Sequence, residues 1–128
     1  MTFILDSSAL LAALLNEPGK ERVDAVINGA MMTTVNLAEV AGHFAKLGLD
    51  HAEIETILNE LPIIDVQPDR ELAIEAGIMR PVGESVGLSL GDRVCLAQAK
   101  RVNATALTTD RAWKEVADRL GVSVELIR

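Results

Sequence analysis

The sequence predicts an α/β fold with a mostly parallel, five-stranded sheet and helices on both faces. Five short apolar runs are separated by helical patterns, and strands that alternate with helices favour a parallel sheet covered on both sides. The chain has 128 residues, of which 49% are hydrophobic. A chain of this length and hydrophobic content can form one hydrophobic core but is too short for two domains of ordinary size. We therefore expect one domain over residues 1–128.

The strands are expected where apolar or β-branched residues form short runs. These runs are Phe3–Leu5, Met31–Val35, Ile63–Val66, Ala104–Leu107 and Val122–Ile127.

The helices before the third strand are expected from apolar spacing and from their end signals. Residues 7–16 repeat Leu and Ala, and the patterns over 20–28 and 36–47 each stop before a glycine. A fourth helix is expected to begin at a capping box formed by Asp50 and Glu53 and to end at the following proline.

The second half of the chain follows the same alternation. Residues 69–79 carry apolar positions up to Pro81, and the segment VGESVGLSLG (82–91), with three glycines in ten residues, is expected to be a loop. Residues 91–102 and 110–120 are expected to be helices on either side of the fourth strand.

The net charge is an ambiguous clue about partners, and the cysteine content fits a reducing compartment. The net charge of −7 argues at first against a nucleic-acid partner, although bound cations would reduce it. The single cysteine, Cys95, cannot form an internal disulfide, and its apolar neighbours indicate a buried thiol. No stretch resembles a signal peptide and none reaches about 18 uninterrupted apolar residues, so we expect a cytoplasmic protein without a membrane span.

Four acidic residues are expected at one edge of the sheet. Asp6 directly follows the first strand, Asp110 follows the fourth, and Glu39 lies one helical turn beyond the second. Asp92 opens the helix after the glycine-rich segment, and helix starts in doubly wound folds belong to that same edge. Because open parallel sheets bind ligands outside the carboxyl ends of their strands, we expect the four carboxylates to converge there.

Capping is the competing explanation for every one of these acids. Asp6 and Asp110 could be N-caps, and both Asn36 with Glu39 and Ser89 with Asp92 have the spacing of a capping box. Taken singly, capping is the better explanation at each position. It explains less well why charged acids stand where hydroxyl residues are already adjacent, namely Ser7, Ser8, Thr34, Thr108 and Thr109.

Converging carboxylates repel one another unless a cation neutralises them. Oxygen ligands with no His or Cys nearby indicate Mg²⁺ or Mn²⁺, since softer ligands favour zinc or copper. Mg²⁺ is usually held by few carboxylates and keeps several waters, which leaves positions for phosphate oxygens. The pattern therefore favours a phosphodiesterase site.

Four segments contain these acids: ILDSSALLAALLNEPG (4–19), TTVNLAEVAGHF (33–44), GLSLGDRVCLAQAK (87–100) and ALTTDRAWKEV (106–116). In their order and spacing they resemble the conserved blocks of the PIN-domain nucleases, and within that family the VapC toxins of toxin–antitoxin pairs. The resemblance implies a single PIN-like domain acting as an Mg²⁺- or Mn²⁺-dependent endoribonuclease. It places the family's catalytic and metal-binding acids on Asp6, Glu39, Asp92 and Asp110.

The resemblance also implies roles for residues around the acids. The family's hydroxyl after the first acid falls on Ser7 and the hydroxyl of its last block on Thr108, both as contacts behind the acids or to phosphate. Trp113 stands where relatives often have Phe and is expected to pack. The implied partners are RNA, a cognate antitoxin that blocks the site, commonly with a basic side chain, and a second copy in a homodimer.

Basic residues on the last two helices are candidate phosphate contacts. Arg93 and Arg111 each directly follow a site acid and are the stronger candidates. Lys100, Arg101 and Lys114 lie further along the same helices, where a solvated helix face explains them equally well. With Phe3, Phe44 and Trp113 as the only aromatics, base stacking is not expected to be a main source of RNA affinity.

Other interpretations stay open at this stage. A receiver-like, Mg²⁺-binding signalling domain would need an acidic pair near the first strand and a Lys after the last, but ILDSS contains one acid and VELIR no Lys. A non-catalytic RNA- or protein-binding domain would tolerate loss of all four acids. A metal-free ribonuclease would need groups such as two histidines, and His43 and His51 are more simply ordinary helix residues.

Overall fold

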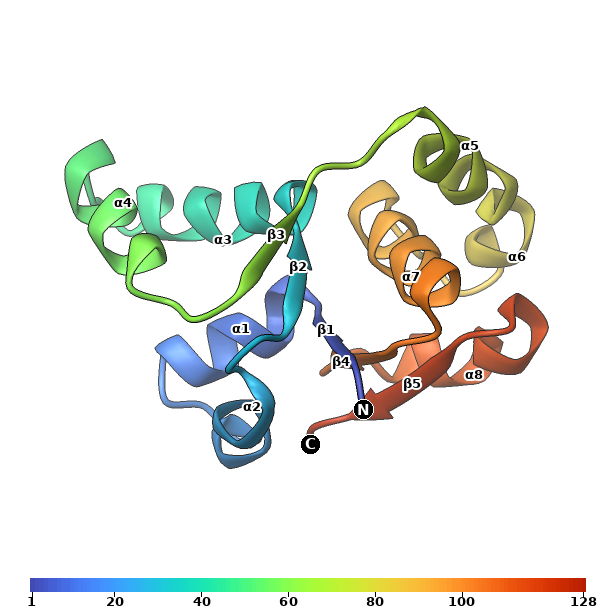
Figure 1. Ribbon diagram of the computed structural model, residues 1–128, viewed down its shortest axis with the longest axis horizontal. Coiled ribbons are helices and arrows are strands. Elements are labelled where there is room, and N and C mark those ends of the chain that lie inside the picture. The colour runs from blue at the N-terminus through green and yellow to red at the C-terminus, as the bar shows by residue number, and fades with distance from the viewer.

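The computed structural model describes residues 1–128 and contains five strands and eight helices in one α/β domain (Figure 1). The strands are β1 (Phe3–Leu5), β2 (Met31–Thr33), β3 (Ile64–Val66), β4 (Thr105–Thr108) and β5 (Ser123–Leu126). They form one sheet in the order β3-β2-β1-β4-β5, and every neighbouring pair is parallel. The predicted fold class is confirmed, and the sheet is parallel throughout.

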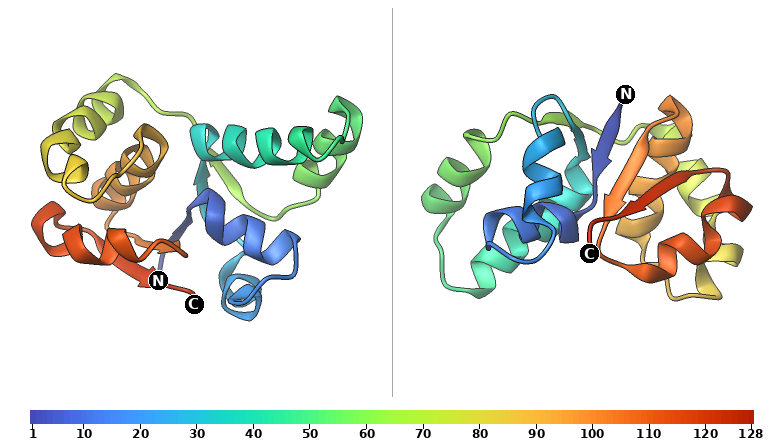
Figure 2. Two further views of the ribbon diagram at one scale, coloured as in Figure 1. Left: turned by 180° about the vertical axis from the view of Figure 1, so that it is seen from behind. Right: turned by 90° about the horizontal axis from the view of Figure 1, so that it is seen from below.

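Helices cover the sheet in two groups, seen on its two sides in Figures 1 and 2. The first group contains α1 (Ser7–Leu14), α2 (Lys20–Val26), α3 (Thr34–Lys46) and α4 (His51–Asn59). The second contains α5 (Arg70–Ile78), α6 (Arg80–Glu84), α7 (Leu90–Val102) and α8 (Arg111–Leu120). No helix combines the length and apolar content that crossing a membrane would require.

Each face of the sheet has its own hydrophobic core, because successive side chains of a strand point to opposite faces. Ile4 and Ala106 belong to the core under α5–α8, whereas Leu5 and Leu107, their neighbours in the sequence, belong to the core under α1–α4. Apolar residues of α4 and of the segment after it pack against the second of these cores: Ile54, Ile57, Leu58 and Leu61.

The predicted loop over 82–91 is wrong in part, because α6 occupies its first residues. The helix predicted up to Pro81 ends before it, at Ile78, and Pro81 itself lies in the first turn of α6, where its missing N–H leaves no bond unmade. Gly83 is buried beneath Leu88, whose N–H donates to the Gly83 carbonyl at 2.9 Å. A glycine-rich segment was therefore predicted as a loop although its apolar residues fold back onto the core.

Gly19, before α2, is the backbone position where we expect a substitution to be most disruptive. Its φ is +100°, and an added Cβ would lie 2.8 Å from the Ile127 carbonyl oxygen. Gly19→Ala is expected to lower the free energy of unfolding by about 2–4 kcal/mol, combining left-handed strain with overpacking. Gly29→Ala is the control, since Gly29 has φ +82° with open space around it and should show the strain alone. Equal losses in urea denaturation would contradict the predicted clash.

Strand order determines where a ligand can bind. From β1 the chain moves outward to β2 and β3, then returns to place β4 on the other side of β1 and β5 beyond it. The connections that follow β1 and β4 therefore diverge to opposite faces of the sheet. Such a switch point leaves a crevice beyond the carboxyl ends of the two strands, which is where Asp6 and Asp110 lie.

Candidate active site

The four predicted acids come from four separate elements around this crevice. Asp6 is the N-cap of α1, Asp110 is the N-cap of α8, Asp92 is the third residue of α7, and Glu39 lies on α3. Their charges act on one another: Asp92 and Glu39 both raise the pKa of Asp6, and Asp110 and Glu39 both raise that of Asp92. The structure therefore places these carboxylates close enough together for their charges to interact.

Asp6 lies at the bottom of this group and is only 3% exposed. Its Oδ1 accepts the Ser7 N–H at 2.8 Å, and its Oδ2 accepts the hydroxyls of Ser8 at 2.7 Å and Thr108 at 2.8 Å. Burial raises the pKa of Asp6 to about 6, while the two hydroxyl donors oppose that rise. A buried carboxylate surrounded by other acids is costly without a positive partner.

Ser8, rather than Ser7, holds the loop before α8 against Asp6. The Ser8 hydroxyl accepts the Thr109 N–H at 3.1 Å, and the Thr108 hydroxyl accepts the Asp110 N–H at 3.1 Å. The two hydroxyls that reach Asp6 Oδ2 thus also fix the segment that carries Asp110. The predicted Ser7 also contacts Asp6, since its hydroxyl donates to Oδ1 at 3.4 Å, but nothing in the sequence indicates the role of the adjacent Ser8.

The capping predictions hold for three of the acids. Asp6 caps α1, Asp110 Oδ1 accepts the Ala112 N–H at 2.9 Å, and Ser89 with Asp92 makes both bonds of a capping box. The predicted box of Asn36 and Glu39 is wrong, because Thr33 caps α3 and places Asn36 inside its first turn.

Capping does not exclude metal binding, because each cap uses one carboxylate oxygen. Asp92 Oδ1 and Asp110 Oδ2 have no hydrogen-bond partner in the protein, and neither does Glu39 Oε2. Partial burial raises the pKa of Asp92, and the charges of Asp110 and Glu39 raise it further against the two bonds with Ser89. Three free anionic oxygens around a buried fourth acid fit a hard divalent cation.

The carboxylates do not form a complete set of metal ligands. No three acidic, His or Cys side chains lie close enough together to hold a metal ion by themselves. Mg²⁺ does not need such a set, since it is commonly held by one or two carboxylates and completes its octahedron with water and phosphate oxygens. The donor chemistry therefore fits Mg²⁺ or Mn²⁺.

The basic residues predicted on α7 and α8 divide into two groups. Arg111 is exposed at the start of α8 and makes no ion pair. Arg93 packs against α5 and α6, where its Nη1 donates to the Ala76 carbonyl at 2.9 Å, so the structure does not bring this guanidinium to the acids. Arg93 follows Asp92 in sequence, but a helix turns the next side chain by about 100°.

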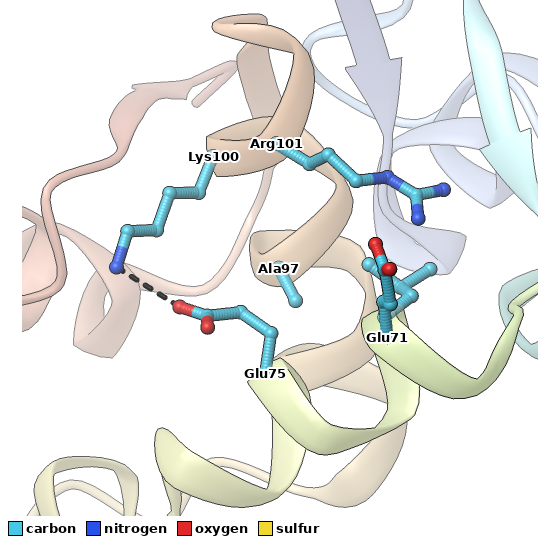
Figure 3. A pocket seen from close by; sticks show the side chains of 6 residues that line it. Glu71, Glu75, Ala97, Lys100 and Arg101 are labelled. Carbon is cyan, nitrogen blue, oxygen red and sulfur yellow. Dashed lines mark hydrogen bonds and ion pairs between the residues drawn. The ribbon is translucent and has the colours of Figure 1, made fainter.

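The remaining basic candidates also have partners away from the acids. Lys100 pairs with Glu75 at 2.9 Å, Arg101 pairs with Asp69 at 2.9 Å, and Lys114 Nζ donates to the Val124 carbonyl. A pocket of about 380 Å³ between α5 and α7 is formed by Glu71, Leu72, Glu75, Ala97, Lys100 and Arg101 (Figure 3). This pocket contains none of the four site acids.

The two histidines do not form a catalytic pair. His43 lies exposed on α3 with its ring edge-on to Phe44, and His51 is exposed at the start of α4 beside Glu55. This placement agrees with their interpretation as ordinary helix residues.

Comparisons with known proteins agree with the observed fold. A family model described as the PIN domain matches residues 3–119. A similar fold occurs in a DNA-bound VapBC from Salmonella typhimurium, with a TM-score of 0.75 and 16% identity over 100% of this chain and 99% of that chain. Another occurs in VapBC2 from Rickettsia felis bound to a promoter DNA fragment, with a TM-score of 0.73 and 16% identity over 98% of each chain. A third is VapC20 from Mycobacterium tuberculosis, a sarcin-ricin loop cleaving toxin, with a TM-score of 0.74 and 14% identity over 90% of this chain and 95% of that chain. No curated protein sequence matches this chain.

Proposed function

The chain belongs to the PIN domain family, and from this premise we propose that it is a metal-dependent endoribonuclease, the toxin of a toxin–antitoxin pair. The observation that carries the proposal is the group of four acids at the switch point between β1 and β4, in which two other members raise the pKa of Asp6 and two raise that of Asp92. Such a group is unfavourable for stability alone and useful for holding a cation against a phosphate.

Within the proposal, Asp6, Asp92 and Asp110 hold one or two Mg²⁺ or Mn²⁺ ions. Glu39 completes the site through water or orients the attacking water molecule. The bound ion supplies positive charge to the scissile phosphate and makes a water molecule more acidic. Ser8 and Thr108 keep Asp6 in place, and Arg111 at the start of α8 is the free cation available to an RNA phosphate.

The toxin assignment is supported by relatives of the same fold. The Salmonella and Rickettsia structures are VapBC complexes, and the mycobacterial protein is a toxin that cleaves the sarcin-ricin loop. By analogy we propose a cognate antitoxin that blocks the acids, a homodimer, and action in the cytoplasm. The family assignment gives no support to a receiver-like signalling domain.

The direct test is incubation of the purified chain with tRNA, rRNA and mRNA in Mg²⁺ or Mn²⁺, with and without EDTA. We expect cleavage that EDTA abolishes. Because water is the proposed nucleophile, the products should carry 5′-phosphate and 3′-hydroxyl ends. End-group analysis that finds 2′,3′-cyclic phosphates would overturn this mechanism, since those ends require attack by the RNA 2′-hydroxyl.

A further inference from the structure

Asn36 connects the start of α3 to the start of α7. Its side chain is completely buried, and its Oδ1 accepts the Thr33 hydroxyl. Its Nδ2 donates to Glu39 Oε1 at 2.9 Å and to the Gly91 carbonyl at 3.1 Å. One amide thus binds a site acid and the backbone immediately before Asp92.

Gly91 provides the surface on which the Glu39 carboxylate lies. A Cβ added at Gly91 would stand 2.7 Å from Glu39 Oε2 and 2.9 Å from both Oε1 and Cδ. Gly91 lies within α7 and its φ is not positive, so the backbone conformation does not require glycine there. What requires the absence of a side chain is the carboxylate itself.

We propose that Asn36 and Gly91 form a seat that positions the Glu39 carboxylate beside Asp92. This inference rests on the proposed function and deepens it by assigning two positioning residues. Gly91 limits how close the carboxylate approaches α7, and the Asn36 amide determines which oxygen is held and which stays free. Oε1 accepts from Asn36, which leaves Oε2 against Gly91 and without a hydrogen-bond partner in the protein.

The seat is needed because Glu39 is a long side chain on an exposed part of α3. Without fixed partners it would populate several rotamers, and ordering it would cost entropy whenever the site is occupied. Groups that orient ligand side chains typically change metal affinity or activity by about 10- to 100-fold when they are removed.

The test compares two alanine substitutions of helix glycines. Gly91→Ala is expected to displace the carboxylate and to weaken Mn²⁺ binding, measured by calorimetry without RNA, by about 10- to 100-fold, with a similar loss of cleavage. Gly77→Ala is the matched control, because Gly77 lies on α5 with nothing within 4 Å of an added Cβ. Ala has the higher helix propensity, so neither variant should have a lower melting temperature than the original protein.

A double-mutant cycle separates the seat from a general effect on α7. In a Glu39→Ala background, Gly91→Ala should cause no further loss of Mn²⁺ affinity, because the displaced group is already absent. Asn36→Leu, which has a similar shape and removes both N–H donors without adding a charge, should weaken Mn²⁺ binding in the same direction as Gly91→Ala.

Two results would count against the seat. If Gly91→Ala binds Mn²⁺ and cleaves RNA as the original protein does, the seat is overturned while the proposed nuclease stands. If the unsubstituted protein neither binds Mn²⁺ nor cleaves RNA, both proposals fall together.

Discussion

Asp6→Asn is expected to abolish RNA cleavage while making the metal-free protein more stable. Activity should fall by about 10²- to 10⁴-fold, since the several kcal/mol that a fixed cation contributes to the transition state depends on this carboxylate. Stability should rise because Asn keeps an oxygen acceptor for the Ser7 N–H and removes a buried negative charge on which the charges of Asp92 and Glu39 act.

The stability gain has a definite pH dependence. The folded-state pKa of about 6 lies above the ordinary value of 3.8, so the folded protein binds this proton more tightly than the unfolded chain does. The contribution of Asp6 to stability is therefore complete below pH 3.8 and is lost as pH rises to about 6. Above that range Asp6→Asn should exceed the original protein by up to about 3 kcal/mol.

Urea denaturation between pH 4.5 and 7.5 in EDTA measures this difference. Asp118→Asn, an exposed α8 residue without side-chain hydrogen bonds, controls for the loss of one charge. Adding Mn²⁺ should stabilise the original protein but not Asp6→Asn, because only the former has a site to fill. If Asp6→Asn is less stable and still cleaves RNA, Asp6 is only a helix cap.

Trp113→Ala is expected to cause the largest loss of stability. Trp113 is fully buried in the core between the sheet and α5–α8, and removing so large a side chain costs about 3–5 kcal/mol. Because small domains are stable by only about 5–15 kcal/mol, this variant should unfold at much lower urea concentration. Its loss should also loosen α8, which carries Asp110 three residues earlier.

Trp113→Phe is the matched control. The indole Nε1 of Trp113 is buried without a hydrogen-bond partner, so Phe removes an unpaired donor together with part of the ring. The cost should be smaller than for Ala, because Phe keeps most of the buried ring and leaves a smaller cavity. Circular dichroism in urea measures both variants, and equal losses for Ala and Phe would show that the indole nitrogen matters more than the packing.

The sequence predicted most of the fold because its strands and helices are local patterns. All five strands and seven of the eight helices lie where apolar spacing and end signals placed them, with differences of a few residues at their ends. The missed helix, α6, has only five residues and contains Pro81 and Gly83, so its composition is that of a loop. It packs against α5 and α8, which is tertiary information that local sequence patterns do not contain.

The convergence of the four acids could be predicted from the sequence, whereas the groups that orient them could not. Strand ends identified Asp6 and Asp110, because the topology brings the carboxyl ends of parallel strands to one edge. The roles of Ser8 and Asn36 depend on side-chain directions that the sequence does not specify. Arg93 shows the opposite error, since adjacency to Asp92 in the chain does not mean adjacency in space.

The pairing of β1 with β4 has a consequence for synthesis of the chain. Phe3 is in register with Thr105, so β1 has no partner on that side until the ribosome has made the segment around residue 105. The acids at positions 6 and 110 can meet only after that pairing. In a nascent chain the proposed nuclease centre therefore stays incomplete until both of these segments have been made and have paired.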